Sequence, residues 1–167
     1  MYKEYAMPWT KPYKPVSNQT LDLELYEQSG RITFITIHAY NRLNPFVNDP
    51  INQMVIRILH SEQTRLNCRV FVYCLMPKHL HFLISPNQDG VSILTFTNQF
   101  KGKTTNLSWD LGWQGKLWHP RFYDHIVRAD KNLRAIAEYI IANPVRKDLV
   151  STPEDWPWSG SFSPIPV

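Results

Sequence analysis

Two apolar segments separated by only two residues constrain the fold of this chain more than any other feature. The first, residues 70–76, reads Val-Phe-Val-Tyr-Cys-Leu-Met, and the second, residues 79–85, alternates between two faces. The length and β-rich composition of the first segment are typical of a central strand that is covered on both faces. Because the chain turns at Pro77 and Lys78, the two segments are predicted to be partner strands.

Further strands and helices are predicted on both sides of this hairpin. In chain order they are a strand over 31–40, a helix with Asp49 as cap that fades near Leu66, the hairpin, a helix capped by Ser92 with a basic, glycine-broken end at 101–103, a strand around 123–127, and a helix from Asp130 to Pro144. The order predicts an α+β fold: a ferredoxin-like split βαββαβ antiparallel sheet with a further C-terminal helix.

The size and charge of the chain suit one domain with a basic surface. Its 167 residues include 43% hydrophobic residues, enough for one core. We expect an N-terminal arm over 1–29, a domain over 30–150 and an irregular tail over 151–167. Lys and Arg outnumber Asp and Glu by 18 to 14, and the pI is near 9.1. That balance suits a polyanionic partner but does not require one.

Two further features concern the compartment. No run approaches the roughly 18 apolar residues of a membrane span, and no apolar signal core stands at the start, so we expect a cytoplasmic protein. Cys68 and Cys74 belong to the same predicted strand, at a separation of roughly 20 Å, and are expected to be reduced.

The candidate site combines two distant parts of the chain. His79 and His81 project from one face of a strand and could hold a divalent metal. Tyr139 and Asn143 lie four positions apart, on one flank of the last helix. Leu80, Phe82 and Ile84 share the opposite face of this strand. If they contact the first two helices, the two histidines face the last helix, which carries Tyr139. Each residue also has a structural interpretation: a partly exposed histidine pair, an interfacial tyrosine, and an asparagine that ends a helix before proline.

Three motifs occur together in the order seen in one family. They are Cys-Leu-Met-Pro-Lys-His-Leu-His at 74–81, Trp-His-Pro-Arg-Phe-Tyr-Asp-His at 118–125, and Tyr-Ile-Ile-Ala-Asn-Pro-Val at 139–145. With them, roughly residues 25 to 160 resemble the REP-associated tyrosine transposases. These are relatives of the insertion-sequence single-tyrosine transposases in the wider HUH endonuclease class. The resemblance assigns the 30–150 domain to the HUH single-tyrosine type.

This resemblance implies a metal-dependent tyrosine nucleophile. His79, His81 and Asn143 would bind Mg²⁺ or Mn²⁺, and Tyr139 would attack a phosphodiester of single-stranded DNA, which leaves a 5′-phosphotyrosine and a free 3′-OH. The metal would polarise the phosphate and neutralise charge in the transition state. The insertion-sequence relatives commonly carry Gln where this chain has Asn143, whereas the REP-associated branch resembles it with Asn.

Basic side chains around the site are candidates for DNA binding, although charged flanks are usually only solvated faces. The candidates are Lys101, Lys103, Arg121, Arg128, Arg134 and Arg146, with Lys131 and Lys147 as further flanking charges. The other histidines lack a paired motif and are interpreted as structural; they are His38, His60, His119 and His125.

The leading hypothesis is a transposase that nicks and joins hairpin-forming repeat DNA. It would act as a monomer or a homodimer, in the cytoplasm and associated with the nucleoid. The alternative is a catalytically silent, domesticated module that binds structured DNA or RNA on the same surface. A metal-dependent hydrolase of small phosphate esters is a more remote third hypothesis, because the chain has no second acidic cluster or glycine-rich phosphate loop.

Overall fold

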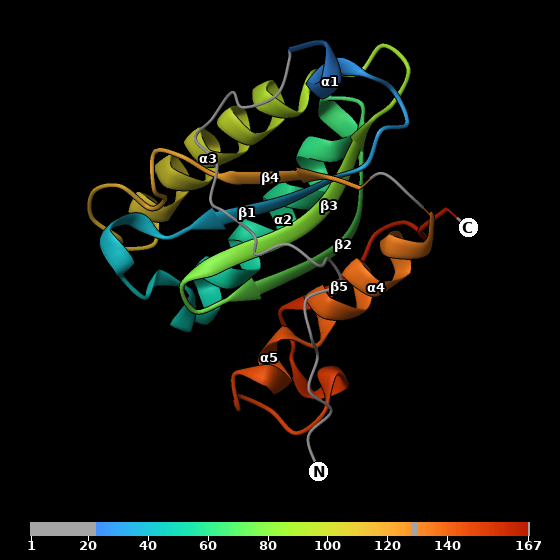
Figure 1. Cartoon of the computed structure of the whole chain (residues 1–167). Helices are drawn as coiled ribbons and strands as arrows, with labels where there is room; N and C mark the ends of the chain where they lie inside the picture. The colour runs from blue at the N-terminus through green and yellow to red at the C-terminus, as the bar shows by residue number, and fades with distance from the viewer. Residues whose placement is uncertain (1–22, 128–129, 167) are drawn as a thin grey trace.

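The hairpin predicted from the sequence forms the middle of a five-stranded antiparallel sheet (Figure 1). The structure, a computed structural model, describes residues 23–127 and 130–166. The strands are β1 (Thr33–His38), β2 (Cys68–Met76), β3 (His79–Pro86), β4 (Tyr123–Ile126) and β5 (Ser159–Ser161), and their order is β4-β1-β3-β2-β5. The first four strands have the order and direction of a split βαββαβ sheet, so this prediction is confirmed.

Helices cover both faces of the sheet (Figure 1). One face carries α2 (Asp49–Arg65) and α3 (Ile93–Asp110), and the other carries α4 (Asp130–Ile141), which the short helix α5 (Asn143–Arg146) follows. The remaining elements are α1 (Leu23–Glu27), η1 (Tyr40–Arg42), η2 (Pro45–Val47) and η3 (Pro153–Asp155). Each helical layer therefore has its own core with one face of the sheet.

Strand alternation separates the two cores as the sequence predicted. Leu80, Phe82 and Ile84 of β3 belong to the core under α2 and α3, whereas Leu83 belongs to the core under α4. Because successive side chains of a strand point to opposite faces, His79 and His81 lie on the α4 face with Leu83. The topology thus turns the histidine pair toward the tyrosine helix.

Two predicted helix boundaries are wrong. The second helix does not break at Gly102 but continues to Asp110. A single glycine costs only about 1 kcal/mol in a helix, and the buried Phe100, Thr104 and Ser108 continue the packed face beyond it. At the start of α2, the side chain of Asn48 caps the helix by accepting a hydrogen bond from the backbone N–H of Ile51, so Asp49 is already helical.

The segment 151–167, expected to be irregular, contains η3 and β5. The strand reads only Ser-Gly-Ser, which carries no alternation of apolar and polar residues, so the sequence gives no sign of it. It is held by pairing with β2, and the backbone N–H of Phe162 also donates to the carbonyl of Phe71 at 2.9 Å. Of the expected arm, only residues 23–29 lie in the described part, and Tyr26 of α1 is buried there.

The structure bears on two further features of the sequence, the cysteines and the apolar character of the helices. Both cysteines are free and buried, as predicted. Among the described residues, no helix combines the length and the apolar character that crossing a membrane would require.

Candidate active site

Cross-strand pairing of β1 and β3 builds the polar part of the site. Thr36 lies opposite His81 and His38 lies opposite His79, so four polar side chains stand together on the face that α4 covers. His81 is 9% exposed, and Asn143, the first residue of α5, is 1% exposed. Thr36, His81 and Asn143 are therefore almost fully withdrawn from water, whereas His38 and His79 are partly exposed.

The two histidines are oriented by their neighbours. The hydroxyl of Thr36 and Nδ1 of His81 form a hydrogen bond of 2.7 Å, which leaves Nε2 of His81 for another partner. The ring centroids of His79 and His81 are 4.5 Å apart. Metal-binding histidines usually engage their second ring nitrogen in this way, because the hydrogen bond fixes the tautomer and the ring orientation.

Asn143 approaches the histidine pair from the helical layer. Its amide nitrogen lies 3.3 Å from Nε2 of His79, and its buried amide oxygen has no hydrogen-bond partner in the described structure. The nitrogen and oxygen of an amide exchange places when the group flips, so either atom can face His79. In the flipped orientation, the amide oxygen would lie beside the imidazole nitrogen, so both could bind one cation.

Burial keeps both imidazoles uncharged. It is the main cause that lowers the pKa of His79 to about 3, with smaller contributions from the charges of His38, Lys147 and Arg146. The pKa of His81 is also well below its ordinary value, again mainly through burial. Metal ligation requires a neutral imidazole, so the site holds its nitrogens in the form that binds a cation.

His79, His81 and Asn143 could supply two imidazole nitrogens and one amide oxygen to a divalent cation, which would leave its protein shell incomplete. Within residues 23–127 and 130–166, no cluster of three or more His, Cys, Asp and Glu side chains could hold a metal. The third ligand would therefore be the amide oxygen of Asn143. The amide nitrogen of Asn143 lies 3.3 Å from Nε2 of His79; an amide flip would bring the oxygen to that place, at a separation close to the roughly 3 Å expected between neighbouring ligands that are each about 2.1 Å from an octahedral ion.

Tyr139 stands one helical turn before Asn143, and Arg146 packs on its ring. The guanidinium carbon of Arg146 is 3.6 Å from the ring centroid, and one guanidinium nitrogen donates to the backbone carbonyl of Tyr139 at 3.4 Å. Burial lowers the pKa of Arg146, while its interactions with Tyr139 act in the opposite direction. A half-buried cation thus lies against the candidate nucleophile and within electrostatic reach of His79 and His81.

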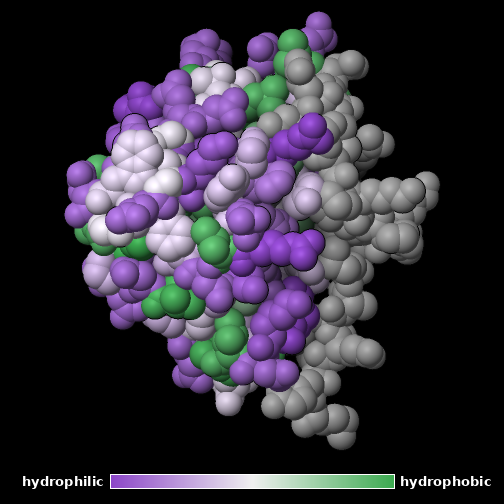
Figure 2. Space-filling model, turned by 90° about the vertical axis from the view of Figure 1, so that its left-hand side faces the viewer, coloured by the Kyte–Doolittle hydropathy of each residue, from purple (hydrophilic) through white to green (hydrophobic). Residues whose placement is uncertain are grey.

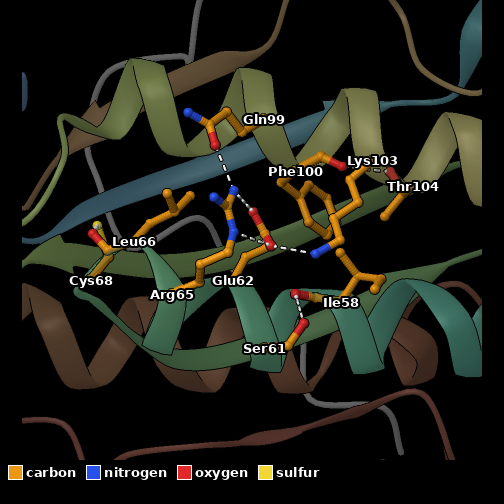
Figure 3. A network of polar contacts seen from close by, with 10 residues as sticks. All are labelled: Ile58, Ser61, Glu62, Arg65, Leu66, Cys68, Gln99, Phe100, Lys103 and Thr104. Atoms are coloured by element: carbon orange, nitrogen blue, oxygen red, sulfur yellow. Dashed lines mark hydrogen bonds and ion pairs between the residues drawn. The ribbon is translucent and has the colours of Figure 1, made fainter.

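Other predicted DNA contacts are distributed over the molecule. Lys103 forms an ion pair of 2.9 Å with the buried Glu62 between α2 and α3, on the opposite face of the sheet from the site (Figure 3). Lys101 donates to the carbonyl of Pro120 at 2.9 Å, and burial lowers its pKa to about 8. Both lysines thus have structural contacts, and their binding to DNA stays a prediction.

The arginines differ in position. Arg121 is exposed and lines a cleft beside His79, whereas Arg134 is exposed on α4. Arg128 and the side chain of Lys131 lie outside the described residues. Of the residues predicted to bind DNA, Arg146 therefore lies at the candidate site, and Arg121 lies in the cleft beside it.

Sequence reasoning did not place Thr36 and His38 at the site. The ring of His38 is 5.5 Å from that of His79 and 5.1 Å from that of Tyr123. Burial lowers the pKa of His38, and its buried Nδ1 has no hydrogen-bond partner in the part of the chain described. The alternation of residues 31–40 put both residues on one face, but only the register with β3 sets them beside the histidine pair.

Similarity to known proteins extends over most of this chain. The family model described as "Transposase IS200 like" matches residues 29–143, which is more than half of the chain. The REP-associated tyrosine transposase of Escherichia coli K12 is 25% identical over 138 residues, which cover 80% of this chain and 78% of that protein. A Haemophilus influenzae protein described as "Putative REP-associated tyrosine transposase" is 27% identical over 145 residues, which cover 78% of this chain and 79% of that protein.

Two solved structures have the same fold. A REP-associated tyrosine transposase bound to a REP hairpin superposes with a TM-score of 0.70 at 23% identity, over 80% of this chain and 78% of the other. A transposase from Deinococcus radiodurans superposes with a TM-score of 0.51 at 18% identity, over 68% of this chain and 91% of the other. At these identities the structural likeness concerns the fold alone.

Proposed function

Because the chain belongs to the IS200-like transposase family, we propose that it cleaves and rejoins single-stranded, hairpin-forming repeat DNA through a covalent tyrosine intermediate. The observation that carries the proposal is the convergence of His79, His81 and Asn143, with Tyr139 one helical turn away. The hairpin is proposed as substrate because one relative of the same fold was solved with a REP hairpin.

The proposed reaction forms one bond and breaks one. The phenolic oxygen of Tyr139 attacks the phosphorus, the bond between phosphorus and the 3′-oxygen breaks, and the DNA is left with a 5′-phosphotyrosine and a free 3′-OH. The leaving 3′-oxygen takes up a proton, and the phenol loses one. Attack by a 3′-OH on the phosphotyrosine reverses the step and joins the strands, because the covalent intermediate conserves the energy of the bond.

The residues of the site have separate tasks in this proposal. His79, His81 and Asn143 would hold Mg²⁺ or Mn²⁺, which would polarise the scissile phosphate and neutralise charge as the transition state forms. Arg146, which packs on the ring of Tyr139, adds a fixed positive charge beside the nucleophile. Burial of the histidines keeps them available as neutral ligands across the neutral pH range.

A trapping experiment tests the chemistry. The purified protein is incubated with labelled single-stranded hairpin DNA and either Mn²⁺ or EDTA, and denaturing gels are examined for a protein-DNA adduct. We expect an adduct only with metal. Tyr139→Phe should remove the adduct while leaving DNA binding within about twofold, since the variant lacks only the nucleophilic oxygen. Tyr40→Phe, a tyrosine variant outside the site, should keep the adduct.

The metal assignment is tested separately. The double variant His79→Ala and His81→Ala should lose metal-dependent cleavage and the binding of Mn²⁺ measured by electron paramagnetic resonance. Cleavage by this double variant or by Tyr139→Phe would contradict the proposal. Tight binding of the hairpin without an adduct, in the presence of either metal, would favour the catalytically silent binding module.

A further inference from the structure

The candidate metal site offers neutral donor atoms only. His79, His81 and Asn143 could present two imidazole nitrogens and one amide oxygen, and none of these groups carries a negative charge. Within residues 23–127 and 130–166, no Asp or Glu completes a metal-holding cluster with the two histidines. Sites for Mg²⁺ and Mn²⁺ ordinarily include carboxylates, whose charge attracts the cation. The protein therefore provides ligands for a cation without the charge that would draw it in.

Arg146 places a positive charge against this site. Its guanidinium carbon packs 3.6 Å from the ring centroid of Tyr139, and its side chain is half-buried, where solvent screens a charge less than at the surface. Burial is the main cause that lowers the pKa of His79 and of His81, and the charge of Arg146 adds to it at both residues. The guanidinium therefore also repels any cation that these histidines would hold.

Lys147, the residue after α5, adds a second positive charge on the same side. It is exposed and lines the cleft beside His79, which has a volume of about 760 Å³. Together with burial, its charge contributes to the lowered pKa of His79. Three further cations line the same cleft: Arg42, Lys78 and Arg121. Positive charge thus surrounds the ligands that are proposed to hold a cation.

No side-chain carboxylate offsets this charge. Among the described residues, the ion pairs with carboxylates involve Glu62, on the other face of the sheet, and include neither Arg146 nor Lys147. Glu138 and Asp148, which precede Tyr139 and follow Lys147, are exposed and do not line the cleft. The molecular face at the end of the sheet where β1 ends is mainly hydrophilic, with its hydrophobic residues in separate patches (Figure 2). The missing negative charge can therefore come from a ligand, and a DNA phosphate carries it.

We propose that Arg146 and Lys147 keep the metal affinity of the site low until a DNA phosphate enters, so that the cation and the DNA bind cooperatively. The inference rests on the proposed function and adds to it a condition for filling the site. The phosphate supplies the negative charge that the neutral ligands lack, and it offsets the repulsion from both basic side chains. By linkage, the factor by which DNA raises the affinity for metal equals the factor by which metal raises the affinity for DNA. The chain without DNA then holds little metal beside Tyr139.

The test measures the affinity for Mn²⁺ and does not depend on cleavage. Every chain carries Tyr139→Phe, which prevents cleavage and keeps the ring on which Arg146 packs; this parent chain is the reference. Electron paramagnetic resonance quantifies free Mn²⁺ in titrations of the protein alone, of the protein with hairpin DNA, and of the hairpin alone. Arg146→Gln and Lys147→Gln each remove one charge, and Arg146→Lys keeps it. Arg57→Gln, at an exposed arginine of α2, is the charge-matched control.

We expect the hairpin to tighten the binding of Mn²⁺ to the parent chain by about tenfold or more. Without DNA, Arg146→Gln and Lys147→Gln should each bind Mn²⁺ about threefold to tenfold more tightly than the parent chain, because one repelling charge is gone. Arg146→Lys and Arg57→Gln should both match the parent chain. A purely structural role of Arg146 predicts the opposite sign, since a disturbed α5 would misplace Asn143 and weaken the binding of metal.

Three results would overturn the inference. They are an Mn²⁺ affinity that the hairpin leaves unchanged, an unchanged or weaker affinity in Lys147→Gln without DNA, and an equal gain in Arg57→Gln. Lys147 is exposed, so its variant decides the question even where Arg146→Gln disturbs α5. Failure of the proposed function is separable from these results, because it would appear in the native chain as the absence of a metal-dependent adduct.

Discussion

At the scale of single residues, the hydrogen bond between Thr36 and His81 is the feature that most directly orients the candidate metal ligands. Its length is 2.7 Å, and both residues are buried. Without it, the imidazole of His81 could rotate or adopt the other tautomer, and Nε2 would no longer be fixed toward the metal position. Thr36 is therefore a positioning residue for the proposed centre.

Replacing Thr36 by valine tests this role. Thr36→Val keeps the branched shape and removes only the hydroxyl, and we expect the affinity for Mn²⁺ to fall by roughly 10-fold to 100-fold. Isothermal titration calorimetry or electron paramagnetic resonance measures that affinity without reference to catalysis. Thr36→Ser should restore most of it, and Thr33→Val, on the same strand, is the matched control. Native affinity in Thr36→Val would show that the hydroxyl does not position the ligand.

The candidate site was only partly predictable from the sequence. His79, His81, Tyr139 and Asn143 carry recognisable motifs. Strand and helix periodicity put each pair on one face, and the predicted split βαββαβ topology turned the two faces toward each other. Thr36 has no motif, and its place beside His81 depends on the pairing of β1 with β3. A shift of that register by one residue would move Thr36 to the other face, so local sequence could not identify it.

At the scale of helices and strands, Glu62 links the two helices that cover the far face of the sheet (Figure 3). Its carboxylate is fully buried and accepts from Arg65 at 2.6 Å and from Lys103 at 2.9 Å. The hydrogen bond from Arg65 is the main cause that lowers the pKa of Glu62, with Lys103 acting in the same direction and burial opposing both. The charged form of Glu62 thus stabilises the packing of α2 on α3.

Glu62→Gln should lower the free energy of unfolding at neutral pH by about 1.5 to 3 kcal/mol, the usual contribution of a hydrogen bond to a charged group. The folded-state pKa lies below the ordinary value of 4.5, so this contribution is complete above pH 4.5 and is lost as the pH falls through the folded-state value. Urea unfolding across that range measures it. Asp110→Asn, at an exposed position, is the control, and a pH-independent difference between native and Glu62→Gln would refute the explanation.

Elements were predicted best where packing and periodicity agree. The stripe of α4, with Leu133, Ile136 and Ile140 buried, fits a helix and is one. The predicted break at Gly102 failed because tertiary packing outweighed local propensity, as it often does. Pro144 removes one backbone donor, and α4 ends before it at Ile141. The chain continues as α5 because a proline fits the first turn of a helix.

At the scale of the whole molecule, the C-terminal segment closes one edge of the sheet. β5 pairs with β2, which would otherwise be an edge strand with unpaired N–H and C=O groups. Trp156 and Ile165 pack on the same core as α4, and the indole N–H of Trp156 donates to the carbonyl of Leu75 at 3.0 Å. The segment therefore supports the helix that carries Tyr139 as well as the sheet.

Removing residues 151–167 should therefore destabilise the whole fold, because this segment pairs with β2 and packs on the core under α4. We expect a lower melting temperature and self-association through the exposed edge of β2, detected by calorimetry and light scattering.

Because so large a deletion could prevent folding altogether, Trp156→Phe provides a milder test: it keeps an aromatic ring and loses the N–H, and should lower the free energy of unfolding by about 1 kcal/mol. Trp109→Phe, at an exposed site on α3, should cost less. A truncated chain with native melting behaviour would mean that β5 and Trp156 rest on the sheet without stabilising it, and that α4 is held in place by its own apolar face alone.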